Sequence, residues 1–133
     1  MKSVGEVMSI GKTFEEAIQK GLRMIGQGMH GFVGNKDIPT TDIKDMLVNP
    51  TDMRIFIIAQ AFKEGLSVDE IYELSKIDKW FLVKLKNIYT YKNELQKYNS
   101  LEQLPIELLM EAKKLGFSDF QIARFVLKSR TEL

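Results

Sequence analysis

One junction decides the fold and occurs twice in the chain, first as GLSVDEIYEL at residues 65–74 and again as GFSDFQIARF at residues 116–125. Each copy has a glycine, an apolar residue, a serine and then, three residues after the serine, a Glu or Gln. Glycine commonly ends a helix in a left-handed conformation, and Ser-x-x-Glu or Ser-x-x-Gln is a capping box that begins one. Both stretches therefore predict two helices joined by a tight turn.

The second copy begins 51 residues after the first, which suggests a duplicated helical unit. The alternative is that the same favourable turn arose twice independently. Under duplication Asp78 corresponds to Ser129, so a further helix of the second unit would start where the sequence stops. On this reading we expect the chain to be cut from something longer.

Further helices extend outward from the two junctions, because apolar residues recur there at helical spacing. In the first half of the chain the expected helices are 14–26, with a capping box of Thr13 and Glu16, one or two turns within 42–48 before Pro50, and one begun by Asn49 or Thr51 and ending at Gly65. In the second half they are one begun by Ser67, one begun by Asp78, one opened by Ser100 and Gln103 with Pro105 near its first turn and ending at Gly116, and one begun by Ser118. The predicted fold is all-α, with two small helical lobes.

Two segments do not follow this pattern. Residues 26–40 hold four glycines and a proline, which predicts an irregular, mobile loop between lobes with few apolar contacts. Residues 4–10 predict a short strand or an extended lead-in at the N-terminus. A lone strand is not stable, so this lead-in should pack against something outside the chain.

Composition excludes several kinds of chemistry. The 133 residues are 44% hydrophobic and 28% charged, with a net charge of +1 and no basic excess for nucleic-acid binding. The absence of cysteine excludes disulfides, thiolate zinc sites and thiol nucleophiles, and the single histidine excludes a site with two imidazoles. No apolar run is long enough for a bilayer and no export signal is readable, so we expect a soluble chain.

Local motifs for catalysis are weak. GQGMHG at 26–31 matches a phosphate-binding glycine pattern, but a helix precedes it where a strand would be required. His30 has no acid or hydroxyl partner placed by any pattern, which favours a plain loop residue. The acidic pairs at 15–16 and 69–70 fall in first helical turns, where carboxylates favour the helix dipole.

The aromatic pair Trp80 and Phe81 allows two readings. Four lysines at 76, 79, 84 and 86 surround it, as on a single-strand nucleic-acid platform, but four are few. Trp80 is better explained as an anchor in a core or an interface, and its replacement by Ala would cost about 3–5 kcal/mol if it were buried.

A separate alternative is a free-standing peptide- or ubiquitin-binding helical module that uses an exposed Gly116-Phe117 loop. The staple between Phe117 and Ile122 places Phe117 in the interior instead.

Three ordered blocks resemble one enzyme family. MKSVGEVMSIGKTFEEA at 1–17 resembles the exit of the first ATP-grasp module in the large synthetase chain of carbamoyl phosphate synthase. GLSVD at 65–69 with LSKIDKWFL at 74–82, and KLGFSD at 114–119, resemble that enzyme's oligomerisation, or connection, domain. Gly21 stands where the family usually has alanine, and residues 27–50 follow no family pattern.

The resemblance implies a helical domain at 13–133, with 1–12 as the tail of the preceding ATP-grasp module. It would lie between the halves that form carboxyphosphate and carbamoyl phosphate, in a ligase that uses bicarbonate, glutamine or ammonia and two ATP, with Mg²⁺ or Mn²⁺ and K⁺. The implied partners are the flanking halves, a second copy and a glutaminase domain or subunit, but neither nucleic acid nor membrane.

The implied location is the cytoplasm, or alternatively the mitochondrial matrix, and the pathway (pyrimidine, arginine or urea) stays open. No catalytic, cofactor-binding or metal-binding residue transfers to this segment. The expected structural or interface residues are Gly65, Ser67, Asp78, Trp80, Phe81, Leu82, Gly116 and Phe117.

Overall fold

The computed structural model describes residues 8–24, 31–33, 35 and 42–127, and every regular element in these ranges is an α-helix. The helices are α1 (Phe14–Met24), α2 (Ile43–Val48), α3 (Arg54–Lys63), α4 (Val68–Ser75), α5 (Lys79–Leu95), α6 (Ile106–Lys114) and α7 (Asp119–Leu127). The all-α prediction is confirmed.

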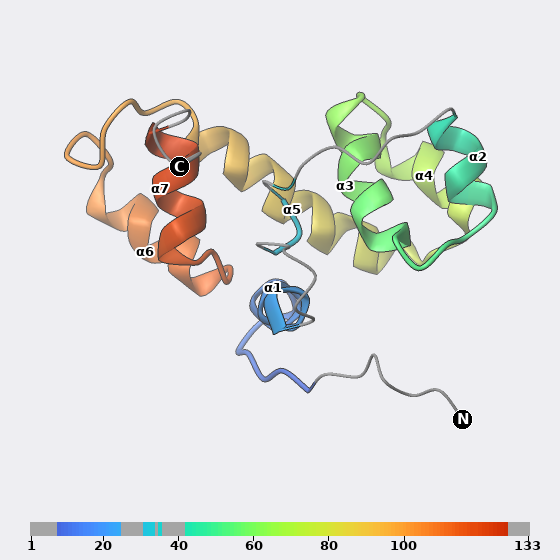
Figure 1. Ribbon diagram of the computed structural model, residues 1–133, viewed down its shortest axis with the longest axis horizontal. Coiled ribbons are helices and arrows are strands. Elements are labelled where there is room, and N and C mark those ends of the chain that lie inside the picture. Colours follow the sequence, from blue (N-terminus) through green and yellow to red (C-terminus); the bar gives the residue numbers. More distant parts are fainter. Residues whose placement is uncertain (1–7, 25–30, 34, 36–41, 128–133) are drawn as a thin grey trace.

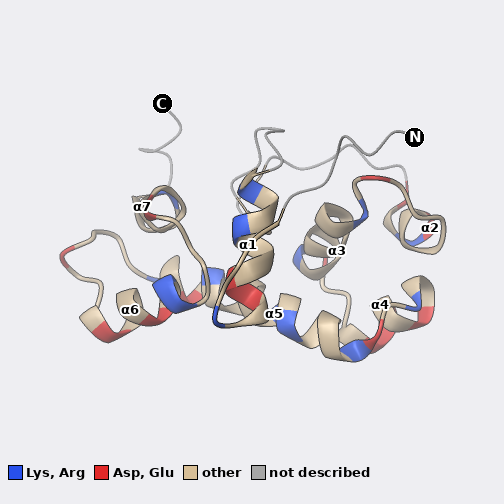
Figure 2. Ribbon diagram, turned by 90° about the horizontal axis from the view of Figure 1, so that it is seen from below, with Lys and Arg blue, Asp and Glu red and all other residues tan. Residues whose placement is uncertain are grey.

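Two lobes share the long helix α5 (Figure 1). The first lobe contains α2, α3 and α4: α2 contacts both α3 and α4, and α3 and α4 each contact α5. The second lobe contains α6 and α7, with α7 packed against α5. Helix α1 lies between the lobes and contacts α5, as Figures 1 and 2 show from two directions.

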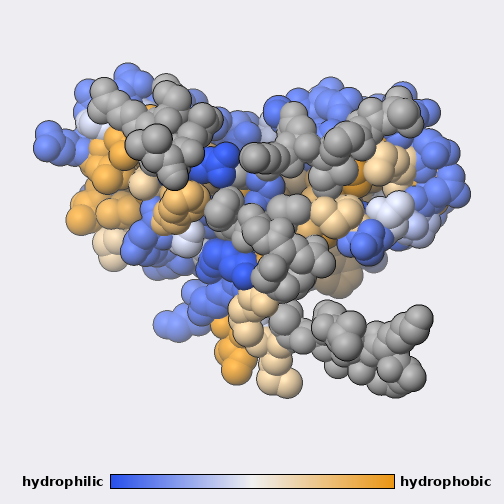
Figure 3. All heavy atoms as spheres, viewed as in Figure 1, coloured by the Kyte–Doolittle hydropathy of each residue, from blue (hydrophilic) through white to orange (hydrophobic). Residues whose placement is uncertain are grey.

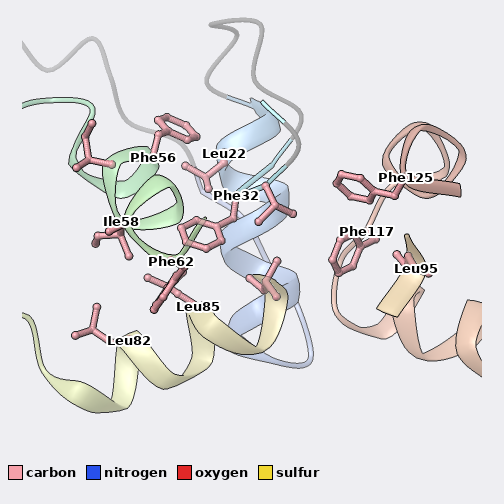
Figure 4. Packing of buried hydrophobic residues seen from close by; sticks show 14 of the residues in the cluster. Leu22, Phe32, Phe56, Ile58, Phe62, Leu82, Leu85, Leu95, Phe117 and Phe125 are labelled. Carbon is pink, nitrogen blue, oxygen red and sulfur yellow. The ribbon is translucent and has the colours of Figure 1, made fainter. Parts of the chain in front are cut away.

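Helix α5 can serve both lobes because its buried side chains extend along its whole length. Leu82 and Leu85 are 0% and 2% exposed and face the first lobe, near Phe62 (Figure 4). Leu95 is 0% exposed and lies beside Phe117 of the second lobe. Full burial of one such side chain stabilises the fold by roughly 1.5–3 kcal/mol. One helix therefore contributes to both lobes of a single hydrophobic core.

The two junctions have the same backbone hydrogen bonds. Gly65 and Gly116 adopt left-handed φ angles of 94° and 86°. After each glycine, the next N–H bonds back to an alanine carbonyl in the preceding helix, from Leu66 to Ala61 over 3.0 Å and from Phe117 to Ala112 over 3.1 Å. The second set again lies 51 residues after the first, so the predicted helix, turn and helix are confirmed in both places.

Both capping boxes are also formed. The N–H of Glu70 donates to Ser67 Oγ and the N–H of Ser67 donates to Glu70 Oε1, each over 3.1 Å. Gln121 and Ser118 make the corresponding pair of bonds over 3.1 and 2.9 Å.

Two predicted helix starts are wrong. The N–H of Gln103 donates to Ser100 Oγ over 3.3 Å, but these residues form a separate turn, and α6 begins only after Pro105. Proline favours the start of a helix because it has no N–H to leave unpaired, so it sets the boundary there.

Neither Asn49 nor Thr51 caps α3 directly. The N-cap is Met53, whose N–H donates to Thr51 Oγ1 over 3.2 Å in the turn before the helix.

The expected loop at 26–40 is irregular where it is described, but it does not lack apolar contacts. Phe32 and Val33 are 0% and 4% exposed and belong to the hydrophobic core. Phe32 lies between α1 and the first lobe (Figure 4). The expectation of few apolar contacts is therefore wrong for the described part of the loop, because Phe32 and Val33 pack in the interior.

Some predictions concern residues outside the described ranges. These are the end of the helix expected at 14–26, most of the glycine pattern with His30, the first part of the lead-in at 4–7, and Ser129 of the proposed duplication.

Candidate structural and interaction site

A buried pair of glutamines connects α1 to the second lobe. Gln19 and Gln121 are 0% and 1% exposed, and Gln121 Nε2 donates to Gln19 Oε1 over 3.1 Å. Gln121 Nε2 also donates to the carbonyl of Val33 over 3.4 Å, and Gln19 Oε1 accepts the N–H of Phe32 over 3.1 Å. Gln19 Nε2 donates to the carbonyl of Leu115 over 3.2 Å. The pair thus holds α1, residues 31–33 and the α6–α7 turn together.

Arg23, in the last turn of α1, bonds to the same region as the two glutamines. We call Gln19, Gln121 and Arg23 together the polar centre. Its Nη1 donates to the carbonyl of Gly116 over 2.6 Å and to Gln121 Oε1 over 3.3 Å. Burial lowers the pKa of the Arg23 guanidinium from its ordinary value. A buried polar group is costly unless it is hydrogen-bonded, so this set of partners offsets its desolvation.

Two glycines allow the close approach that the polar centre requires. A Cβ on Gly31 would lie 2.5 Å from Gln19 Oε1 and 2.7 Å from Gln121 Nε2. A Cβ on Gly116 would lie 2.7 Å from the Cα of Glu16. Gly31 of the predicted glycine pattern is therefore explained by packing against the glutamine pair.

An aromatic corner, which we define as Phe14, Trp80 and Phe81, lies where α1 and α5 begin. The ring centroids of Phe14 are 5.5 Å from those of both Trp80 and Phe81, and the latter two rings are 5.0 Å apart. Trp80 is 53% exposed and Phe81 44% exposed. Lys84 Nζ lies 5.4 Å from the centroid of the Trp80 ring. The three rings are therefore packed together while Trp80 and Phe81 remain open to solvent.

The sequence predicts that Trp80 anchors a core or an interface, and its exposure of 53% excludes the core position. Asp78 accepts a hydrogen bond from the N–H of Trp80 over 2.8 Å, which sets the start of α5. The helical period then turns Leu82 and Leu85 inward and leaves Trp80 on the outer side. Of the two predicted roles, only that of an interface residue is compatible with this exposed position of Trp80.

The other predicted residues lie in three places. Asp78 and Leu82 share the start of α5 with the aromatic corner, as cap and core residue. Gly65 and Ser67 form the turn of the first lobe, and Gly116 and Phe117 form that of the second. The predicted residues therefore support the fold at separate points and do not form one site.

Phe117 is buried, with 2% of its surface exposed. Its ring lies 6.0 Å from Phe125 and 6.1 Å from Tyr91, centroid to centroid. A Gly-Phe loop that binds ubiquitin needs an exposed Phe117, so the alternative of a free-standing ubiquitin-binding module is wrong on this geometry.

Two of the four lysines near Trp80 form ion pairs within the first lobe. Lys79 forms an ion pair with Asp69 over 3.0 Å, which raises the pKa of Lys79, and Lys76 pairs with Glu73 over 3.4 Å. Positive charge on this face is thus partly neutralised (Figure 2).

The predicted acidic pairs occupy helix starts as expected. Glu16 accepts the N–H of Lys12 over 2.6 Å, and this bond lowers the pKa of Glu16. Glu15 has a further role, because it is 6% exposed and accepts a hydrogen bond from Asn87 Nδ2 of α5 over 3.1 Å.

Within the described ranges, no group of three or more His, Cys, Asp or Glu side chains could hold a metal ion. None of the described helices combines the length and the apolar character needed to cross a membrane.

Comparison with known families assigns the chain. The family described as "Carbamoyl-phosphate synthetase large chain, oligomerisation domain" matches residues 6–133. The chain belongs to this family. The resemblance to the oligomerisation domain seen in the sequence is therefore confirmed over residues 6–133 of the chain.

Relatives of the oligomerisation domain come from distant organisms. "Multifunctional protein pyr1-3" of Dictyostelium discoideum is 53% identical over 127 residues, which is 95% of this chain and 6% of that protein. "Carbamoyl phosphate synthase arginine-specific large chain, mitochondrial" of Neurospora crassa is 53% identical over 127 residues, 95% of this chain and 11% of that protein.

A third relative is "Carbamoyl phosphate synthase large chain, N-terminal section" of Aquifex aeolicus, which is 43% identical over 134 residues, 99% of this chain and 23% of that protein. The chain thus spans less than a quarter of the length of each of these three relatives.

The polar centre of the oligomerisation domain was not predicted from the sequence. One signal was available: Gln121 occupies the capping-box position that Glu70 occupies in the first copy. A carboxylate can accept the capping bond, but only the amide can also donate to Gln19 and Val33. The change from Glu to Gln between the copies therefore marks a second, donating role.

Proposed function

We propose that this domain connects and aligns the catalytic parts of a longer carbamoyl phosphate synthase polypeptide and contributes to its self-association. It supplies no catalytic residue of its own. The family match over residues 6–133 carries this proposal. The division into an ATP-grasp tail at 1–12 and a helical domain at 13–133 stays a prediction.

The architecture suits a connecting role. Helix α5 has 17 residues and therefore spans about 25 Å between the two lobes. The buried pair Gln19 and Gln121 restrains α1 relative to the second lobe. A domain held in this way can set the distance and angle between the regions attached to it.

In this proposal the longer polypeptide makes carbamoyl phosphate from bicarbonate, glutamine or ammonia and two ATP. Its ATP, Mg²⁺ or Mn²⁺, and K⁺ bind in the flanking ATP-grasp halves, and a glutaminase domain or subunit supplies the ammonia. No nucleotide or metal step is assigned to the described residues. The cytoplasm is the proposed location, with the mitochondrial matrix as the alternative.

Sedimentation tests the association, with the 133-residue chain and the longer polypeptide each measured over a range of concentrations. We expect weak self-association of the chain and a tighter oligomer of the longer polypeptide, because neighbouring domains align the surfaces there. A chain that stays monomeric, together with a longer polypeptide whose oligomer survives deletion of residues 52–127, would leave only the connecting role.

An assay of bicarbonate-dependent ATP turnover tests the absence of catalysis in this domain. We expect none from the 133-residue chain. Turnover that persists after removal of trace contaminants would contradict the assignment of roles.

A further inference from the structure

Three side chains, on α1 or directly before it, donate hydrogen bonds to successive carbonyls at the end of α6. The bonds run from Thr13 Oγ1 to Lys114 over 3.4 Å, from Gln19 Nε2 to Leu115 over 3.2 Å and from Arg23 Nη1 to Gly116 over 2.6 Å. Carbonyls at the end of a helix lack partners within it and carry partial negative charge, which suits a cationic donor. Side chains of α1 therefore cap α6.

The same face of α1 is bonded to α7. Gln121, in the first turn of α7, donates to Gln19 over 3.1 Å and accepts from Arg23 over 3.3 Å. The backbones are also close, because a Cβ on Gly116 would lie 2.7 Å from the Cα of Glu16. Helices α1 and α7 are the first and last helices of the described ranges, so the polar centre joins the two ends of this part of the chain directly.

Contacts of α1 toward the first lobe are of a different kind. Leu22 lies near Phe32 and Phe56, and all three side chains belong to the hydrophobic core (Figure 4). Hydrophilic atoms instead lie between α1 and the second lobe (Figure 3). Apolar attraction is non-directional, whereas a hydrogen bond weakens steeply when its donor and acceptor lose alignment. The polar centre therefore fixes the angle of α1 relative to the second lobe.

The hydrogen bond between the glutamines is a short route through the molecule. Along the chain, Gln19 and Gln121 are 102 positions apart, with the first lobe, α5 and α6 between them. Across the polar centre, their amides are 3.1 Å apart. A change in the angle of α1 therefore reaches α7 without passing through the first lobe.

We propose that the polar centre sets the relative orientation of the regions that precede and follow this domain in the longer polypeptide, so that Gln19, Arg23 and Gln121 are positioning residues for its reaction. This inference rests on the proposed function, which places catalytic halves on both sides of the domain. It goes further by assigning their alignment to three side chains rather than to helix α5 alone.

Alignment matters to this reaction because the two halves act in sequence. In the proposed polypeptide one half forms carboxyphosphate and the other forms carbamoyl phosphate, so an intermediate has to pass between them. Carboxyphosphate that escapes into water is hydrolysed to bicarbonate and inorganic phosphate. Exclusion of water from the reacting groups prevents such side reactions. Loss of alignment should therefore consume ATP without forming carbamoyl phosphate.

An arginine of the first lobe provides a matched control. Arg54 Nη2 donates to the carbonyls of Leu47 and Ser75 over 3.5 and 2.5 Å, so it holds the ends of α2 and α4 together. Arg54 and Arg23 thus make the same kind of bond, to carbonyls at or next to helix ends, in different parts of the domain. Arg54→Met should lower stability without disturbing the contact between α1 and α7.

The test compares Arg23→Met with Arg54→Met in the longer polypeptide. Both substitutions keep an unbranched side chain and remove the guanidinium. Carbamoyl phosphate formed and ATP consumed are measured on the same samples, and small-angle X-ray scattering follows the arrangement of the catalytic halves. Circular dichroism melting and sedimentation verify folding and oligomeric state.

We expect Arg23→Met to lower the carbamoyl phosphate formed per ATP consumed by about three- to tenfold, because a small misplacement far from the reacting atoms can have effects of this size or larger. Bicarbonate-dependent ATP turnover should persist, since it takes place within one half. The radius of gyration should increase at an unchanged oligomeric state. Arg54→Met should change neither the yield per ATP nor the radius of gyration.

A second pair of variants serves if an arginine variant fails to fold. Gly116→Ala and Gly65→Ala both add a methyl group at a left-handed φ, but only Gly116 lies against α1. Gly116→Ala should therefore lower the yield of carbamoyl phosphate per ATP, and Gly65→Ala should leave it unchanged.

An unchanged yield per ATP in Arg23→Met would overturn the proposal, whatever the scattering shows. Equal losses of yield within either pair would also overturn it, by attributing the effect to general stability. A longer polypeptide that forms no carbamoyl phosphate even without substitution, but whose radius of gyration increases in Arg23→Met alone, would reject the proposed function and leave the alignment by the polar centre standing.

Discussion

Gln121 of α7 donates a side-chain hydrogen bond to Gln19 of α1 over 3.1 Å, and both side chains are almost completely buried. The same Gln121 caps its own helix by accepting the N–H of Ser118. The amide of Gln121 thus caps the start of α7 and also joins α7 to α1, through a residue 102 positions away in the sequence. Glu70, its counterpart in the first copy, is exposed and performs only the local task.

Gln121→Glu should lower the free energy of unfolding by roughly 2–3 kcal/mol, because an oxygen would replace the donor to Gln19 and Val33 inside the protein. Glu70→Gln is the matched control, since it keeps the accepting oxygen at an exposed site and should change stability by at most about 0.5 kcal/mol. Urea unfolding measures both. Equal losses in the free energy of unfolding for the two variants would show that the Gln19–Gln121 pair does not hold α1 against the second lobe.

The two junction glycines should differ in their tolerance of alanine. Gly65→Ala should cost about 1–2 kcal/mol, because only the left-handed φ of 94° is strained and nothing lies within 4 Å of the new Cβ. Gly116→Ala should cost at least about 1 kcal/mol more, since its Cβ would also meet the backbone of Glu16 at 2.7 Å. Thermal unfolding compares the two variants. Similar losses would mean that α1 can move away from the second junction.

Trp80 and Leu82 should lose stability to different extents on truncation, although they are two residues apart on α5. Leu82→Ala should cost about 2–5 kcal/mol because the side chain is 0% exposed. Trp80→Ala should cost no more than about 1.5 kcal/mol, since Trp80 is 53% exposed and loses its contacts within the aromatic corner and with Lys84. Urea unfolding of the 133-residue chain provides the comparison. A larger loss for Trp80→Ala would restore the core reading.

Tyr91 should make the second lobe sensitive to alkaline pH. Its hydroxyl donates to the carbonyl of Leu108 over 2.7 Å, and burial, followed by the nearby Glu111 and Glu94 charges, raises the pKa of Tyr91 to about 12. An unfolded tyrosine loses its proton near pH 10, so the folded state binds more protons between about pH 10 and 12. This stabilisation is complete below about pH 10 and is lost as the pH rises toward 12.

Tyr91→Phe should therefore cost about 1 kcal/mol at neutral pH through the lost hydrogen bond. The stability difference between the two proteins should shrink as the pH rises above about 10, which urea unfolding at several pH values can follow. A difference that stays constant up to pH 11.5 or so would show that the Tyr91 hydroxyl titrates alike in both states.

The sequence by itself determined the helices and the turns between them, because these depend on contacts within a few residues. Gly65 with Ser67, and Gly116 with Ser118, ended one helix and began the next as predicted. Asp78 set the start of α5 in the same way. Where a stronger local signal competed, as at Pro105, the predicted boundary was displaced by a few residues.

Only the tertiary structure decided which side chains meet between distant segments. The burial of Phe32 depends on how α1 and the first lobe enclose its side chain, which no local pattern specifies. The pairing of Gln19 with Gln121 likewise exists only after two separate helices approach closely enough for their amides to bond. Helix caps and periodicity act over one or two helical turns. The polar centre instead depends on packing between α1 and α7, whose paired glutamines are 102 residues apart in the sequence.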